Sequence, residues 1–157
     1  MARAREVEVD CEAPFGLVAA RVVEQRAKEV FAHSTGVLDL GDIEGVHDMR
    51  VATRRLRAAL EVFEACFPRK RWRKALKRVK ELADALGERR DRDVEIELFE
   101  GIREEVAEED RAALATMLEE LRVAQHGANE RLAPFVRKKR LRKLRKRLDR
   151  LVAEAER

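Results

Sequence analysis

The sequence is poor in residues that break helices and in aromatic residues. Its 157 residues include three prolines, seven glycines, six phenylalanines, one tryptophan and no tyrosine. So few breakers favour long helices over a β-sheet. Aromatic residues make up only 4% of the chain, which argues against a row of exposed rings that stack nucleotide bases. Hydrophobic residues still make up 45%, enough to bury a core, so we expect one folded all-α domain.

Cysteines are few, and neither a long apolar run nor a secretory leader is visible. The two cysteines, Cys11 and Cys66, lie far apart and lack metal-ligand spacing, as expected of a reduced cytoplasmic protein. No run approaches the roughly 18 apolar residues that a membrane span needs. The first arginines are followed by acidic residues rather than by an apolar segment. We therefore expect a soluble, cytoplasmic protein that does not bind membranes.

Charged residues are abundant, and their sign alternates in blocks along the chain. The net charge of +4 is made of −4 in residues 1–45, +8 in 46–90, −9 in 91–130 and +9 in 131–157. Basic surfaces of this strength concentrate anionic ligands. Such segments can also be ordinary solvated helix faces, and composition alone leaves both interpretations open.

Apolar periodicity predicts a tail, residues 1–13, followed by one domain, residues 14–157, built as an antiparallel bundle of about six helices. The expected helices cover roughly residues 14–34, 46–67, 69–86, 91–106, 114–132 and 137–154, with the acidic stretch 104–110 as a turn. Two boundaries depend on single residues, since Gly87 suits a C-terminal cap and Asp91 suits the N-cap of the next helix. Pro134 should kink or break the fifth helix.

The helices expected over residues 46–67 and 69–86 each combine an apolar face with a basic row. At about 100° per residue, the cations of the first helix fall opposite its apolar residues. Its row is His47, Arg50, Arg54 and Arg57, and that of the second helix is Arg73, Lys77 and Lys80. Arginine binds phosphate oxygens bidentately and lysine adds point charges. A rigid array of this kind therefore indicates a polyanion ligand.

Two motifs carry a resemblance to a known family. Val46–Leu60 reads V-H-D-M-R-V-A-T-R-R-L-R-A-A-L, and Leu86–Val94 reads L-G-E-R-R-D-R-D-V. They resemble the CHAD family, the conserved histidine α-helical domain, and a weaker similarity over Arg131–Leu144 extends the resemblance to about residues 14–150. The resemblance implies two pseudo-symmetric helical bundles with a basic groove that binds inorganic polyphosphate. The site residues that it implies are His47, Arg50, Arg54, Arg57, Arg73, Lys77, Lys80 and Arg90.

Arg90 and the length of the chain leave alternatives open. Arg90 and Asp91 match the second motif, where an ion pair that braces the helix is as well supported as ligand contact. A full family domain repeats the His-x-x-Arg helix in a second half, and no such helix follows residue 94. The chain is thus half-length, and it either binds with half a groove or pairs with a second copy. We expect a homodimer, because two-fold association is the common route to a closed assembly.

Catalysis and metal binding are weakly indicated. His47 has no second histidine or carboxylate cluster near it in the sequence. Helix capping by Asp91 explains the D-x-D of Asp91 and Asp93 more simply than a metal does. The carboxylate set that would hold magnesium on a phosphate substrate is missing. We therefore predict a non-catalytic protein that uses no cofactor and no metal ion, and that associates with polyphosphate granules in the cytoplasm.

Sequence-independent binding of nucleic acid is the alternative function. Trp72 lies in the apolar face of its helix and is expected in the core, so it would not offer a stacking surface for bases. No convincing helix-turn-helix loop precedes the helix that contains His47. Polyphosphate therefore remains the preferred ligand.

Overall fold

The computed structural model describes residues 3–155, so the ends of the expected tail and domain, residues 1–2 and 156–157, lie outside the described residues. Residues 3–155 form five α-helices and no strand, which confirms the prediction of an all-α fold. The helices are α1 (Phe15–Ala32), α2 (Ile43–Val62), α3 (Arg69–Gly101), α4 (Arg111–Val136) and α5 (Lys138–Ala155), with short 3-10 helices at Glu64–Cys66 and Glu108–Asp110.

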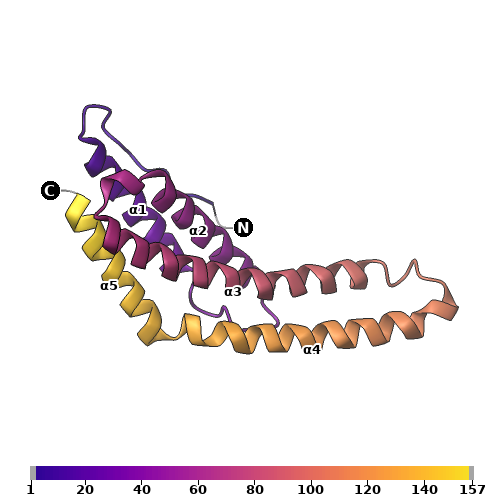
Figure 1. Ribbon diagram of the computed structural model, residues 1–157. Coiled ribbons are helices and arrows are strands. Elements are labelled where there is room, and N and C mark those ends of the chain that lie inside the picture. The colour runs from indigo at the N-terminus through magenta and orange to yellow at the C-terminus, as the bar shows by residue number, and fades with distance from the viewer. Residues whose placement is uncertain (1–2, 156–157) are drawn as a thin grey trace.

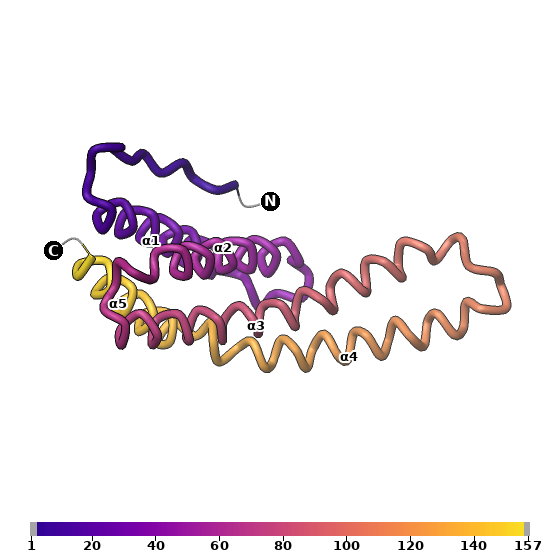
Figure 2. Tube along the Cα trace, turned by 45° about the horizontal axis from the view of Figure 1, so that its top comes forward, coloured from indigo at the N-terminus to yellow at the C-terminus, as the bar shows by residue number. Residues whose placement is uncertain are grey.

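The helices form a bundle from which a long hairpin projects (Figure 1). The bundle consists of α1, α2, α5 and the first half of α3 (Figure 1 and Figure 2). The second half of α3 runs beside α4, away from the bundle (Figure 2). Of the helices within residues 3–155, none combines the length and the apolarity of a membrane span.

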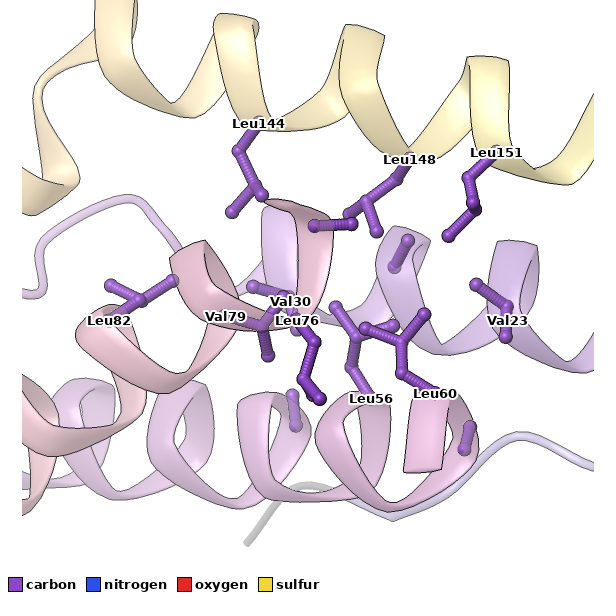
Figure 3. Close-up of a cluster of buried hydrophobic side chains, with 14 of the residues drawn as sticks. Val23, Val30, Leu56, Leu60, Leu76, Val79, Leu82, Leu144, Leu148 and Leu151 are labelled. Atoms are coloured by element: carbon purple, nitrogen blue, oxygen red, sulfur yellow. The ribbon is translucent and has the colours of Figure 1, made fainter. Parts of the chain in front are cut away.

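Leucines on one face of α5 close the core of the bundle. Leu144, Leu148 and Leu151 point toward the other three helices (Figure 3), because their spacing of three and four residues places them on one side of α5. The buried side chains around them include Val23, Val30, Leu56, Leu60, Leu76, Val79 and Leu82. Trp72 is buried in the same core and donates from Nε1 to the Leu60 carbonyl oxygen at 2.7 Å, so its expected core position is confirmed.

The third and fourth expected helices are one helix, α3, of 33 residues. The boundary predicted at Gly87 and Asp91 is wrong, because both residues lie inside α3. Gly87 instead faces α2, where a Cβ atom would lie 4.0 Å from the Arg50 Nε. Arg89 and Asp93, just beyond it, are buried. Packing of α3 against neighbouring parts of the chain therefore keeps the helix continuous through Gly87 and Asp91, where the sequence predicted a boundary.

The later helix ends follow the prediction more closely. The acidic stretch 104–110 forms turns and a short 3-10 helix, as expected. Pro134 does not end its helix, since α4 continues to Val136. The chain leaves the helical conformation at Arg137 (φ −57°, ψ 135°), which separates α4 from α5. The proline therefore precedes the break by one helical turn.

An apolar stripe on the second half of α3 and its C-cap residue, Ile102, stays outside the core. Val94, Leu98 and Ile102 are 47%, 61% and 36% exposed, respectively. Ile96 and Phe99 belong to a small cluster that joins α3 to α4. We name Val94, Leu98 and Ile102 the α3 stripe.

Candidate polyanion-binding surfaces

The arginines of the α2 row lie along a groove between α2 and α3. Asp42 caps α2 by accepting the Gly45 N–H at 3.2 Å, and the arginines follow on one side of the helix. Arg50, Arg54 and Arg57 line a hollow of ≈ 460 Å³, which we name the α2 groove. Within residues 3–155, the side chains of Arg50 and Arg54 form no ion pair or hydrogen bond. They are therefore available to an external anion.

The α3 side of the α2 groove is acidic. Asp84, Glu88 and Asp91 line it together with Ala83 and Gly87. The carboxylates thus oppose the arginines at a position where the resemblance implied further cations. The α2 groove is therefore a mixed surface, with three arginines on its α2 side and three carboxylates on its α3 side.

Arg73 and Lys77 are exposed on α3 and do not line the α2 groove. Lys80, one turn after Lys77, and Arg57 of α2 form ion pairs with the same carboxylate, that of Glu61. Glu61 Oε1 lies 3.1 Å from Lys80 Nζ and 3.1 Å from Arg57 Nε. The hydrogen bond from Lys80, followed by that from Arg57, lowers the pKa of Glu61. Glu61 is therefore ionised at neutral pH and offsets charge at this end of the row.

His47 and Arg90 are more enclosed than the other predicted site residues. His47 is half-buried, and its Nδ1 is buried without a hydrogen-bond partner in the described part of the chain. The side chain of Arg90 is only 14% exposed, and its NH2 lies 3.4 Å from Glu97 Oε2. This contact is an ion pair within α3, which is one of the two roles expected of Arg90.

A second basic hollow, which sequence reasoning missed, lies between α3, the end of α4 and α5. Its volume is ≈ 440 Å³, and we name it the α5 hollow. The cations that line it are Arg78, Arg137, Lys139, Arg140, Lys143 and Arg147. Basic residues were evident in the sequence of the last helix. Only the fold, however, brings them together with Arg78 of α3.

A buried polar network ties α3 to α4 and to the loop before α2. Arg89 NH1 donates to Asp93 Oδ1, and Gln125 Nε2 donates to the same oxygen at 2.6 Å. Arg89 Nε also donates to Asn129 Oδ1 at 3.3 Å, while Asn129 Nδ2 donates to the Leu38 carbonyl oxygen at 2.9 Å. Asp93 therefore acts inside the fold, and the network fixes the position of the hairpin relative to the bundle.

Comparison with known families places these surfaces in context. The CHAD domain model matches residues 21–157 of the chain. The match begins within α1 and includes both of the motifs described above, in α2 and α3. Among curated proteins, none matches the chain.

Proposed function

Because the chain belongs to the CHAD domain family, we propose that it binds inorganic polyphosphate, without modifying it, through the arginines of α2. The family resemblance supports the identity of the ligand. One structural observation carries the proposal: Arg50 and Arg54 line the α2 groove and have no ion-pair partner within residues 3–155. Two arginines one turn apart on a rigid helix offer paired donors to successive phosphate oxygens.

Exposed cations on α3 extend this surface. Arg73 and Lys77 are exposed, and neither forms an ion pair within the described chain. A flexible polyanion in the α2 groove has these side chains as further contacts along α3, beyond Lys80. Each exposed contact contributes little by itself, on the order of 1 kcal/mol or less. Affinity therefore depends on several contacts made together.

Replacing Arg50 and Arg54 by glutamine tests the proposal. The variant is expected to bind long-chain polyphosphate about 30-fold more weakly in isothermal titration calorimetry, since two contacts of about 1 kcal/mol each are lost. The control Arg21→Gln/Arg103→Gln removes the same charge from two exposed residues that form no ion pair within residues 3–155 and lie away from the α2 groove. Affinity at the wild-type level in Arg50→Gln/Arg54→Gln would refute the proposal. Equal losses of affinity in the two variants would also refute it, because they would show that binding depends on net charge rather than on the α2 groove.

Competition in the same titration separates polyphosphate from nucleic acid. Trp72 is buried, and Phe15, although 62% exposed, packs on Phe63 with ring centroids 5.4 Å apart. Neither offers a free stacking surface for bases. Single-stranded DNA at equal charge concentration is therefore expected to displace little polyphosphate, and full displacement would favour the nucleic-acid alternative.

We also propose that two copies of the chain associate through the α3 stripe. The stripe begins one turn beyond Asp91, which lines the α2 groove, so a partner on the stripe would lie next to the groove. A second copy suits this position by charge, because residues 91–130 carry a net charge of −9 and residues 46–90 carry +8. The acidic hairpin of each copy can thus lie against the basic half of the other.

Substituting Leu98 by glutamate is expected to convert the dimer to a monomer in size-exclusion chromatography with light scattering. The introduced carboxylate would be buried against the partner's apolar stripe without a counter-charge. Val123→Glu is the matched control, because Val123 is 65% exposed on α4 and is not part of the α3 stripe. A monomeric wild type at tens of micromolar would contradict the proposal, as would a dimeric Leu98→Glu variant.

A further inference from the structure

We propose that the α5 hollow is a second anion-binding site, which takes a compact oligophosphate such as tripolyphosphate. The inference goes beyond the proposed function, because it concerns other residues and a short ligand. Its cations converge from three parts of the chain: Arg78 on α3, Arg137 between α4 and α5, and Lys139, Lys143 and Arg147 on α5. Lys139, Lys143 and Arg147 are spaced by four, so they share one side of α5, and Arg140 of the same helix also lines the hollow.

The charge in the α5 hollow is poorly balanced by the chain itself. Glu81 is the carboxylate that contacts its cations, with Oε2 at 2.7 Å from Arg78 NH1 and 3.4 Å from Arg140 NH2. No ion pair within residues 3–155 is formed by the other four lining cations, which are Arg137, Lys139, Lys143 and Arg147. The α2 groove differs, since carboxylates line its α3 side. A bound anion would therefore relieve more repulsion in the α5 hollow than in the α2 groove.

The size and the lining of the α5 hollow suit a small anion. Its volume of ≈ 440 Å³ falls in the range of about 300–1,000 Å³ that is usual for small-molecule sites. Leu82, Pro134, Phe135 and Leu144 supply apolar walls, which strengthen the field of the surrounding cations. The Arg140 guanidinium lies 4.6 Å from the centre of the Phe135 ring, and this contact orients its donors. The two hollows are similar in size, so the difference in charge balance is what distinguishes the α5 hollow from the α2 groove.

The first turn of α5 adds partial positive charge at the same place. The Arg140 and Leu141 N–H groups donate to the Arg137 carbonyl oxygen, so α5 begins directly after Arg137, beside the hollow. The N-terminus of a helix favours anions through its free N–H groups and its dipole. This effect supplements the cationic side chains, which remain the main attraction.

Two charge-matched variants on α5 test the inference. Lys143→Gln/Arg147→Gln removes two cations that line the hollow. Arg142→Gln/Lys146→Gln removes two exposed cations of the same helix that do not line it and form no ion pair in the described chain. In calorimetry with tripolyphosphate, the first variant is expected to bind about 30-fold more weakly and the second within about twofold of wild type. Thermal unfolding without ligand checks that both variants fold.

The outcomes separate this inference from the proposed function. Arg50→Gln/Arg54→Gln is expected to keep its affinity for tripolyphosphate while losing affinity for the long polymer. If Lys143→Gln/Arg147→Gln binds tripolyphosphate as wild type does, the inference is overturned and the α2 groove is unaffected. Equal losses in the two α5 variants would also overturn it, because they would assign binding to total charge rather than to the hollow.

Discussion

Substituting Asp93 by alanine is expected to destabilise the protein by about 3–5 kcal/mol, because it leaves a buried guanidinium without its counter-charge. The side chains of Arg89 and Asp93 are both fully buried. Without Asp93, Arg89 keeps only Asn129 as a hydrogen-bond acceptor within residues 3–155. Burial, followed by the nearby charge of Arg90, lowers the pKa of Arg89. The site therefore already disfavours the charged guanidinium, and Asp93 is the group that compensates.

Urea denaturation of Asp93→Ala and Asp91→Ala measures this effect against a close control. Asp91 lies two residues earlier in α3, is exposed, and has no ion-pair partner within residues 3–155. Its substitution is expected to change the free energy of unfolding by at most about 0.5 kcal/mol. The double variant Arg89→Leu/Asp93→Leu should recover most of the lost stability, because it removes the buried charge altogether. Equal stability of the Asp93 and Asp91 variants would show that the pair contributes little.

Helix prediction from the sequence succeeded where the signal repeats along one helix, and it failed where tertiary contacts decide. Apolar spacing predicted one apolar face on α2, and that face is buried in the bundle, because such a face repeats within one helix. The boundary at Gly87 and Asp91 was wrong because both are local signals, and local signals compete with packing. Gly87 lies against Arg50 of α2, and Asp93 is bonded to Gln125 of α4. Contacts between residues up to 40 positions apart in sequence thus determine that α3 continues. A prediction from the local sequence of α3 does not include the partner residues of these contacts.

The candidate site was predictable only where it lies on one helix. Arg50, Arg54 and Arg57 share a side of α2 because of helical spacing alone, and the structure brings them together in the α2 groove. Which part of α3 faces them depends on how the two helices are aligned, which residue spacing does not determine. Asp84 and Glu88 therefore occupy the position expected for Arg73 and Lys77. The α5 hollow was missed for the same reason, because it needs cations from separate helices.

Raising the NaCl concentration from about 50 to about 200 mM is expected to weaken polyphosphate binding by roughly 10²–10³-fold. Binding of a linear polyanion releases its condensed counterions, and each phosphate neutralised contributes about −0.7 to the slope of log affinity against log salt for a single strand. The cations of the proposed surface are Arg50, Arg54, Arg57, Arg73, Lys77 and Lys80. If all six make contact, the slope is about −4.

The slope also tests each cation as a contact, which affinity at one salt concentration does not. Removing Arg50 and Arg54 is expected to reduce the slope by about 1.4, because two phosphates are no longer neutralised. Arg57 and Lys80 share Glu61, so binding through them must compete with an existing ion pair. Their removal should therefore change the slope less than removal of Arg50 and Arg54. Titrations of both variants over the same salt series measure this difference. An unchanged slope in Arg50→Gln/Arg54→Gln would mean that polyphosphate does not touch the α2 groove, whatever the affinity.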